Sequence, residues 1–277
     1  MAFGEALVPG YPFWVERTDG ARFNSPIQKA LYAHYLHEAV QPEAGHLQPV
    51  ASAAARARIA VALGTVERAQ DRGGHSLYCS LVYIDRSGVL QSVHRKLMPT
   101  YEERLVWAPG DGHGLRVHAL DALTVGALSC WENWIPLARA ALYGQGENVH
   151  LARWPGSERN TYDITPFLAK EGRSYVLSAS SVMRQSDIRD DVPHHELIVA
   201  NSDEWLADGG SCIAGPDGAW VAEPVAGEEC LIVATLDHAR VREERQNLDP
   251  AGHYARADVT RLTLDRTRQS SLQVVEE

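Results

Sequence analysis

The segment spanning residues 123–146 constrains the fold more than any other part of the chain. Its apolar run Leu-Thr-Val-Gly-Ala-Leu-Ser predicts a short buried strand that ends at Cys130. Residues 136–143, closed by Gly144, have the proline-first, glycine-last pattern of a helix. We therefore expect a thiol at a strand-to-helix corner, where unpaired N–H groups and the helix dipole favour the thiolate form. This segment alone leaves an inert buried cysteine as the alternative.

A second segment, residues 94–104, places a lysine and an acid near each other. Lys96 follows the alternating run 89–93, so we expect it at a strand end, where side chains commonly point into a site. Glu103 follows a Pro-Thr turn and is a candidate partner for Lys96, because a nearby opposite charge keeps a lysine ionised. A solvated surface cluster of basic residues is the alternative.

A third candidate, Glu5, stands alone among the apolar residues near the start of the chain. A carboxylate in such surroundings can serve as a general base towards a thiol. A solvated side chain near a terminus is the alternative that this stretch leaves open.

Taken together, these motifs resemble the nitrilase family of carbon–nitrogen hydrolases. Glu5 lies in Gly-Glu-Ala-Leu-Val-Pro-Gly-Tyr-Pro-Phe-Trp, Lys96 in His-Arg-Lys-Leu-Met-Pro-Thr-Tyr-Glu-Glu-Arg, and Cys130 in Ser-Cys-Trp-Glu-Asn-Trp-Ile-Pro. The resemblance continues along the chain in residues 152–155, 208–218 and 249–259. Three dispersed motifs in the right order are far harder to obtain by chance than one.

By this resemblance Cys130 is the nucleophile, Glu5 the general base, Lys96 the cationic stabiliser and Glu103 the second acid, which positions the lysine. A nitrile carbon is a weak electrophile, so attack needs a thiolate and the charge that develops on nitrogen needs a fixed cation or N–H donor. Lys96 and the backbone N–H of Trp131 are suited to supply both. The implied products are a carboxylic acid and ammonia, formed through a thioimidate and a thioester.

The main departure from the family pattern lies at the N-terminus. Relatives usually carry a strand, a helix and another strand ahead of the first glutamate, whereas only residues 1–4 precede Glu5 here. The implied fold is therefore an α/β protein, an α-β-β-α sandwich of the carbon–nitrogen hydrolase type, with its first strand-helix-strand unit missing. Either the true start lies upstream, or pairing with another subunit compensates for the loss. We favour the first explanation, because a base on a frayed terminus would be poorly held.

The order of predicted elements supports this architecture. Helices are predicted at residues 26–40, 50–58, 161–171 and 237–246, and strands at 59–66, 77–85, 89–94, 148–152 and 175–182. Further short strands are predicted at 211–214, 219–224 and 231–236. No linker, low-complexity tract or repeat divides the chain, so we expect one domain over residues 1–261 and a C-terminal tail over 262–277.

Composition excludes several classes of protein. With 26 basic and 36 acidic side chains the net charge is -10, which opposes binding to nucleic acid or to an anionic membrane surface. No stretch approaches the ~20 apolar residues of a membrane span, and the first residues lack a secretion signal. We therefore expect a cytoplasmic enzyme with no membrane or nucleic-acid partner.

Cysteine and histidine spacing suggests neither a metal site nor a cofactor. No Cys-x-x-Cys motif is present, so the four cysteines are predicted to be reduced, with Cys79 and Cys230 packing in strands. His34 and His37 lie three apart on a predicted helix, where an ordinary helix face explains them better than a metal site.

Substrate contacts and assembly are also expectations. Tyr11, Trp131 and Trp154 are candidate substrate-binding residues, since aromatic faces suit the organic part of a nitrile, although such residues are as often plain core. The resemblance further implies a homodimer or larger homo-oligomer, with the helix after Cys130 and the C-terminal region near subunit contacts.

Three functional hypotheses follow. The leading one is a nitrilase acting on a small organic nitrile. The second is an amidase of the same superfamily, with nitrile or cyanide hydratase activity as a mechanistic neighbour, since the same intermediate can collapse to an amide. The third is a catalytically impaired scaffold or assembly component, because the opening unit of the fold is absent.

Overall fold

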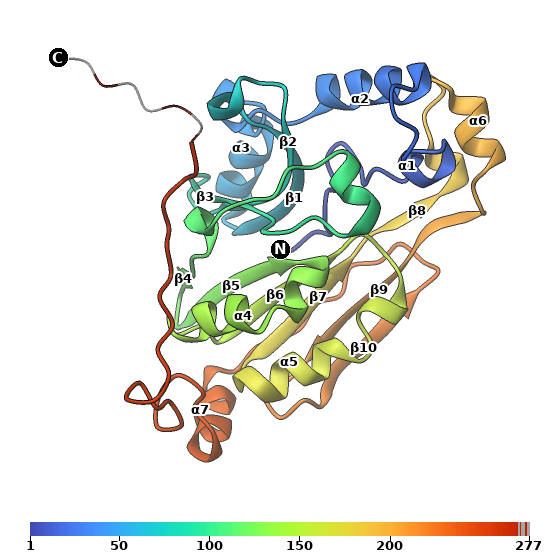
Figure 1. The fold of residues 1–277 in the computed structure, drawn as a ribbon. Coiled ribbons are helices and arrows are strands. Elements are labelled where there is room, and N and C mark those ends of the chain that lie inside the picture. The colour runs from blue at the N-terminus through green and yellow to red at the C-terminus, as the bar shows by residue number, and fades with distance from the viewer. Residues whose placement is uncertain (271, 273–274, 276–277) are drawn as a thin grey trace.

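Two β-sheets form the centre of the computed structural model, which describes residues 1–270, 272 and 275 (Figure 1). The first sheet has the strand order β1-β2-β3, and both of its pairings are antiparallel. Its strands are β1 (Val61–Arg68), β2 (Leu77–Ile84) and β3 (Leu90–Arg95).

The second sheet has the strand order β10-β9-β7-β6-β5-β4, and β8 pairs with β9 off this path. β5, β6 and β7 pair in parallel, and the flanking pairs are antiparallel. The strands are β4 (His118–Leu120), β5 (Leu123–Ser129), β6 (Val149–Trp154), β7 (Tyr175–Ser180), β8 (Val182–Arg184), β9 (Trp205–Ala214) and β10 (Trp220–Ala226).

Helices lie outside the two sheets and in the connections between strands (Figure 1). The α-helices are α1 (Trp14–Arg17), α2 (Pro26–Glu38), α3 (Gln48–Ala57), α4 (Pro136–Tyr143), α5 (Ile164–Gly172), α6 (His195–Ala200) and α7 (His238–Asn247). Short 3-10 helices are η1 (Pro42–Ala44), η2 (Gln70–Arg72), η3 (Tyr101–Leu105), η4 (Gly112–Gly114), η5 (Cys130–Trp134), η6 (Glu158–Asn160) and η7 (Gln185–Asp187).

The hydrophobic core is divided into layers by the sheets. Between the sheets, Leu81 of β2 belongs to one cluster with Val125 of β5 and Leu151 of β6. Ala54 of α3 packs on the outer face of the first sheet, and Leu168 of α5 packs on the outer face of the second. Every residue of β6 is buried, as expected for a parallel strand covered on both faces. The predicted α-β-β-α layering is confirmed.

The N-terminal segment runs parallel to β1 and holds Glu5 between two anchor points. Bridges join this segment to β1 at Ala2 and at Val8, on either side of Glu5. The Glu5 N–H also donates to the carbonyl of Trp154 on the second sheet, at 3.0 Å. Because both sheets bind this backbone, Glu5 occupies a defined and fully buried position rather than a frayed end.

Two predicted strands differ from the structure. The predicted strand 175–182 is split, since β7 ends at Ser180 and β8 pairs separately with β9. Residues 231–236 form no strand, although Leu-Ile-Val-Ala-Thr-Leu is a nearly continuous apolar run, and Leu231 and Val233 are 71% and 79% exposed. An apolar run is compatible with a strand, but a strand also requires a backbone partner, and this segment forms no ladder within the described residues.

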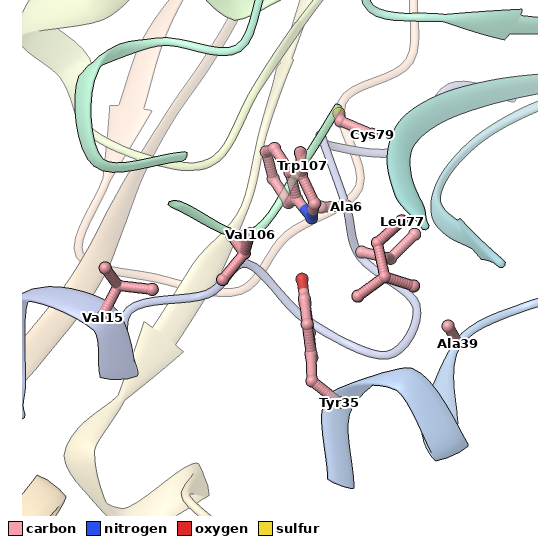
Figure 2. Packing of buried hydrophobic residues seen from close by; sticks show 9 residues of the cluster. Ala6, Val15, Tyr35, Ala39, Leu77, Cys79, Val106 and Trp107 are labelled. Carbon is pink, nitrogen blue, oxygen red and sulfur yellow. The ribbon is translucent and has the colours of Figure 1, made fainter. Parts of the chain in front are cut away.

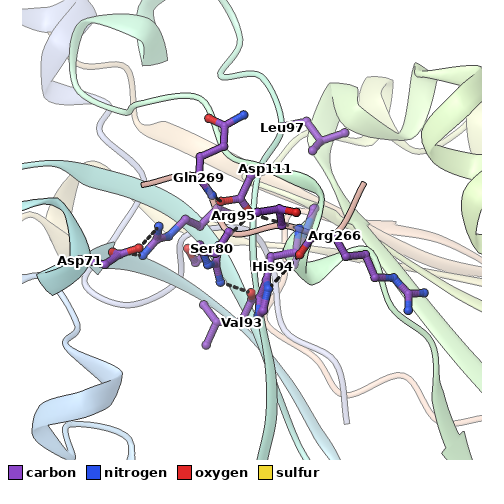
Figure 3. A network of polar contacts seen from close by, with 12 residues as sticks. Asp71, Ser80, Val93, His94, Arg95, Leu97, Asp111, Arg266 and Gln269 are labelled. Carbon is purple, nitrogen blue, oxygen red and sulfur yellow. Dashed lines mark hydrogen bonds and ion pairs between the residues drawn. The ribbon is translucent and has the colours of Figure 1, made fainter. Parts of the chain in front are cut away.

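The predicted tail is described for residues 262–270, 272 and 275, and its positions 271, 273–274 and 276–277 lie outside the described residues. Figure 3 shows the contacts that attach it to the rest of the chain. Arg268 lies 3.0 Å from Asp111 and donates to the Val93 carbonyl at 3.1 Å. Gln269 donates its N–H to the same aspartate at 3.1 Å. The tail therefore packs against the loop that follows β3.

Membrane insertion through a helix is not supported. Among the residues that the structure describes, no helix has the combined length and apolar character needed to cross a bilayer.

Candidate active site

Cys130 lies at a sharp turn directly after β5. Its φ of 52° is in the left-handed region, which a residue with a side chain adopts at an energetic cost and which is often found at functional sites. η5 begins at this cysteine, and α4 begins only at Pro136. The predicted corner between strand and helix is present, but a separate 3-10 turn lies between the thiol and the α-helix.

The surroundings of Cys130 favour the protonated thiol. Burial raises the pKa of this thiol, and Glu5 and Glu103 raise it further. Lys96 and the backbone N–H of Trp131 lower it, yet the net pKa lies well above the ordinary value. Desolvation therefore opposes the thiolate form, which the helix start was expected to favour. A sulfur nucleophile at this position would need a neighbouring base to remove its proton.

Lys96 follows β3, and its side chain is completely shielded from solvent. The ammonium Nζ lies 2.9 Å from Glu5 Oε1 and 2.7 Å from Glu103 Oε2. Burial lowers the pKa of Lys96, but the two acids and Cys130 raise it, and the net pKa is well above the ordinary value. Lys96 is therefore a fixed positive charge shared by two carboxylates.

Glu103 is held by η3 with both oxygens occupied. Oε2 accepts the Lys96 ammonium and the Thr100 N–H, the latter at 2.6 Å, while Oε1 accepts the Tyr11 hydroxyl at 2.9 Å. Burial, together with the charge of Glu5, raises the pKa of Glu103 from 4.5 to about 7, although Lys96 opposes the shift. Glu103 therefore changes its charge near neutral pH.

Glu5 has a partner that the sequence did not predict. Cys79, expected only to pack within a strand, donates its thiol hydrogen to Glu5 Oε1 at 3.2 Å. Figure 2 shows Cys79 and Trp107 among the buried residues that pack here. The Lys96 ammonium lies 5.8 Å from the centre of the Trp107 ring, within the range of a cation–π contact. A cysteine inside an apolar run carries no sequence signal that separates this role from ordinary packing.

Four side chains thus meet at one buried place, and we name Glu5, Lys96, Glu103 and Cys130 the buried centre. Carboxylate oxygens of the two acids and the Cys130 sulfur lie within 4.8 Å of one another. Such a set could in principle bind a metal ion. However, the Lys96 ammonium already binds both carboxylates, so a metal ion would have to displace it and overcome its charge. The arrangement is better suited to moving a proton between sulfur and carboxylate.

A cavity of about 350 Å³ opens onto the buried centre. Its lining consists of Tyr11, Phe13, Glu16, Arg17, Thr100, Glu102, Glu103, Cys130, Trp131, Pro155, Gly156, Ser157, Arg159, Asn160 and Leu206. Tyr11 and Trp131, both predicted to contact substrate, lie in this wall, and Trp131 is 54% exposed. Charged and amide side chains share the lining with the aromatic ones, so the cavity is more polar than the apolar slot that we expected.

Trp154 lies elsewhere. It is fully buried in the core beside Ile164 and Leu168 of α5, and it is not part of the cavity wall. Its indole N–H donates to Ser178 at 3.4 Å. Trp154 influences the site through its backbone, because its carbonyl accepts the N–H of Glu5.

Glu132 connects the segment that carries Lys96 to the segment that carries Cys130. Its Oε1 accepts the N–H of Leu97 at 2.9 Å and lies 2.9 Å from His94 Nε2. Its Oε2 accepts the N–H of Ser129 at 3.0 Å. Burial raises the pKa of Glu132, but His94 and these backbone donors lower it, and the net pKa is below the ordinary value. Glu132 is therefore an ionised clamp between two strand ends.

Arg95 anchors the end of β3 from the other side. Its guanidinium pairs with Glu67 at 2.6 Å and with Asp71 at 2.7 Å, and Ser80 donates to Glu67 at 2.6 Å. The pairing of Arg95 with Asp71 is visible in Figure 3. The residue immediately before Lys96 is thus fixed, which limits the freedom of the lysine backbone.

Comparison with known proteins identifies the class of this fold and site. The family model described as carbon–nitrogen hydrolase matches residues 1–246, so the chain belongs to the carbon–nitrogen hydrolase family. It is a hydrolase that acts on carbon–nitrogen bonds, and the resemblance found in its motifs is confirmed.

Several similar proteins within this family are named as nitrilases. Nitrilase 2 of an unknown prokaryotic organism is 34% identical, over 97% of this chain and 82% of its own length. The aliphatic nitrilase of Sinorhizobium fredii is 34% identical, over 98% of this chain and 85% of its own length. A bifunctional nitrilase/nitrile hydratase of Nicotiana tabacum is 31% identical, over 95% of this chain and 75% of its own length.

Solved structures share the fold at much lower identity. A mutant amidase from Nesterenkonia sp. AN1, in which acrylamide has added to the active-site cysteine, superposes with a TM-score of 0.59 and 16% identity, covering 89% of this chain and 83% of that one. A carbon–nitrogen hydrolase from Helicobacter pylori G27 gives a TM-score of 0.59 and 17% identity, covering 93% of this chain and 94% of that one.

Proposed function

We propose that this protein is a nitrilase, which converts a small organic nitrile and two water molecules into a carboxylic acid and ammonia. The observation that carries the proposal is the convergence of Glu5, Lys96 and Cys130 at one buried place, with Cys130 in the wall of a cavity. The nitrilase relatives at 34% identity support the choice of a nitrile over other carbon–nitrogen substrates.

The first half of the reaction forms a covalent thioimidate. Glu5 takes the proton of Cys130, and the sulfur electron pair attacks the nitrile carbon while one carbon–nitrogen π bond breaks. Lys96 and the Trp131 N–H stabilise the negative charge that develops on nitrogen, and the proton held by Glu5 is delivered to that nitrogen. The product of this half is a neutral thioimidate on Cys130, with Glu5 again ionised.

The second half of the reaction uses two water molecules. Glu5 takes one proton of the first water as the water oxygen adds to the thioimidate carbon, and it passes this proton to the nitrogen. The remaining hydroxyl proton reaches the nitrogen in the same way as the carbonyl forms and the carbon–nitrogen bond breaks, so ammonia leaves and a thioester remains. The second water adds to the resulting thioester in the same way, and the carbon–sulfur bond breaks to give the carboxylic acid. Cys130 recovers its proton from Glu5, so the enzyme returns to its starting state.

An amide is a second possible product of the same intermediate. After the first water has added, cleavage of the carbon–sulfur bond instead of the carbon–nitrogen bond releases an amide. The relatives named bifunctional nitrilase/nitrile hydratase support this branch for this chain as well. Which bond breaks depends on which leaving atom is protonated first, and that proton is held by groups of the buried centre.

The proposal is tested by incubating the full chain with matched aliphatic and aromatic nitriles and with the corresponding amides. Ammonia would be quantified, and acid and amide would be separated by mass spectrometry. Turnover of nitriles to acid, with or without amide, supports the proposal. Turnover of amides with no turnover of any nitrile would assign the amidase alternative, and no turnover in either panel would favour the inert scaffold.

We also propose that the face formed by α4, α5 and η5 pairs two copies of this chain. Trp134, Leu137 and Phe167 are 43%, 65% and 45% exposed, and the Trp134 and Phe167 rings stack at 6.3 Å. Exposed aromatic and aliphatic side chains gathered on neighbouring elements are typical of protein interfaces. A twofold pairing of such a face would bury it against itself.

A further inference from the structure

Arg153, on β6, is a buried cation that the reaction above does not use. Its side chain is fully buried, and one guanidinium nitrogen, Nη2, donates to the Ser129 hydroxyl. Among the described residues, Nε and Nη1 have no hydrogen-bond partner, and none of the ion pairs found there includes this arginine. Burying an arginine without a paired carboxylate is costly, so its presence calls for a compensating interaction.

The arginine extends from the second sheet towards the first. In the register of the parallel pair β5 and β6, Arg153 lies beside Ser129, the residue before the nucleophile. Its Nη1 reaches Gly64 of β1, where a Cβ atom would lie only 2.9 Å from it. The absence of a side chain at Gly64 lets the backbone of Gly4 and Ala6 lie against β1, and it also leaves room for the guanidinium next to this segment.

Charge balance in the centre explains why this position favours a cation. Above the pKa of Glu103, which is about 7, Glu5 and Glu103 contribute two negative charges and Lys96 contributes one positive charge, so these three groups carry a net charge of minus one. A net negative charge opposes removal of the Cys130 proton, because the thiolate would add another negative charge nearby. One more buried cation makes the centre neutral.

We infer that Arg153 is a positioning residue: it supplies the second positive charge of the buried centre and fixes Ser129, the neighbour of the nucleophile. Moving a proton from Cys130 to Glu5 then leaves the total charge of the centre unchanged at zero. The proton transfer takes place in a site of low polarity, where an uncompensated charge would raise the free energy strongly.

The groups that face Arg153 from the surrounding elements agree with this role. They are Glu5 of the N-terminal segment, Cys79 of β2 and Glu132 of η5. Burial lowers the pKa of Arg153 and outweighs these three groups, which raise it, so the net pKa lies below the ordinary value of an arginine. Because that ordinary value is far above neutral pH, the guanidinium keeps its proton there.

The test compares Arg153→Met, which removes the charge, with Arg153→Lys, which keeps it. Ser129→Ala removes only the hydrogen bond, and Arg242→Met removes an exposed positive charge on α7 as a control. The rate of alkylation by iodoacetamide would be measured at Cys130 by peptide mass spectrometry across pH. This readout requires no nitrile, although the inference rests on the proposed roles of Cys130 and Glu5.

We expect Arg153→Met to move the midpoint of the alkylation profile up by about one pH unit, so that the rate at pH 7 falls about tenfold. Arg153→Lys, Ser129→Ala and Arg242→Met should leave the midpoint within a few tenths of a unit. An unchanged midpoint in Arg153→Met, or an equal shift in Ser129→Ala, would overturn the inference.

If Arg153→Met does not fold, Arg153→Lys decides the question, because a shift of a full unit in a variant that keeps the charge contradicts the charge-balance argument. Failure of the wild-type protein to turn over any nitrile or amide would overturn the proposed function, and this inference with it. An active wild-type protein with an unchanged midpoint in Arg153→Met would overturn this inference alone, so the two failures are separate.

Discussion

The Lys96 ammonium lies 2.7 Å from the Glu103 carboxylate, and both side chains are completely shielded from solvent. Glu5 binds the same ammonium, so two acids share one cation. Burial and the charge of Glu5 raise the pKa of Glu103 to about 7. The first prediction concerns the pH dependence that follows from this arrangement.

As the pH falls through about 7, Glu103 takes up a proton and loses its ion pair with Lys96. We expect kcat/KM to fall on the acid side with an apparent pKa near 7, the value at which Glu103 takes up its proton. Glu103→Gln should lower kcat by about 100-fold with a smaller change in KM. Steady-state kinetics across pH would check both, and a flat profile between about pH 5.5 and 8 would contradict the ionised role of Glu103.

The second prediction concerns the nucleophile. Cys130→Ala should abolish ammonia release while leaving the fold intact, because alanine fills most of the volume of a thiol. Cys230→Ala is the matched control, since this cysteine is exposed and lies outside the cavity. Circular dichroism would verify folding of both variants. Residual turnover in Cys130→Ala, or an equal loss in Cys230→Ala, would refute the assignment.

The sequence was most predictive where a motif and a structural position coincide. The strand before Cys130 and the strand before Lys96 are both present, as predicted. Glu103 follows Lys96 closely enough for a local turn to bring the two together. These positions depend on periodicity and turn signals, which are local properties of a sequence.

Contacts between distant segments were not predictable in this way. The sequence around Cys79 is that of an ordinary strand. Its hydrogen bond to Glu5 forms only because the N-terminal segment pairs with β1. The pKa of Cys130 depends on how completely neighbouring elements exclude water, which spacing along the chain does not reveal. The position of Trp154 in a motif suggested a pocket residue. Successive side chains of β6 point to opposite faces of the sheet, and the side chain of Trp154 points into the hydrophobic core.

A third prediction concerns the clamp formed by Glu132. Glu132→Gln should lower the free energy of unfolding by about 3 kcal/mol, since it leaves buried N–H donors without a charged acceptor. The exposed Glu229→Gln should change it little. Because the pKa of Glu132 is lowered, its stabilisation is present above the ordinary pKa of a glutamate and is lost as the pH falls through the lowered value.

Urea denaturation at neutral and acid pH would measure this stabilisation. The difference between wild type and Glu132→Gln should shrink in acid, as Glu132 itself becomes protonated. Equal stability of the Glu132 and Glu229 variants at neutral pH would show that the clamp contributes nothing.

A fourth prediction tests the proposed interface. Leu137→Asp places a charge at the centre of the exposed apolar face on α4 and should convert dimers or larger assemblies into monomers. Phe23→Asp is the control, because Phe23 is 97% exposed and lies outside this face. Sedimentation velocity would report the masses. If wild type is monomeric at micromolar concentration, or if both variants dissociate alike, the interface lies elsewhere.

The last prediction separates the role of Cys79 from its packing. Burial, followed by the charge of Glu5, raises the pKa of Cys79 well above its ordinary value, so this thiol stays protonated and remains a donor to the carboxylate. A donor that holds one oxygen of Glu5 fixes the direction in which the other can accept a proton. Cys79→Ala should therefore lower kcat about fivefold, the equivalent of one hydrogen bond, with little change in KM.

Cys79→Ser keeps a donor at this position and should retain most of the rate, which a purely steric role would not predict. Cys212→Ala supplies the matched control, because Cys212 is also buried but donates to Thr165, away from the buried centre. Both alanine variants remove a buried sulfur and should lose comparable stability, yet only Cys79→Ala should slow turnover. Equal kcat values in the two variants, or no rescue by serine, would show that Cys79 contributes only to packing. Glu5 would then be positioned by Lys96 and by its own backbone hydrogen bond.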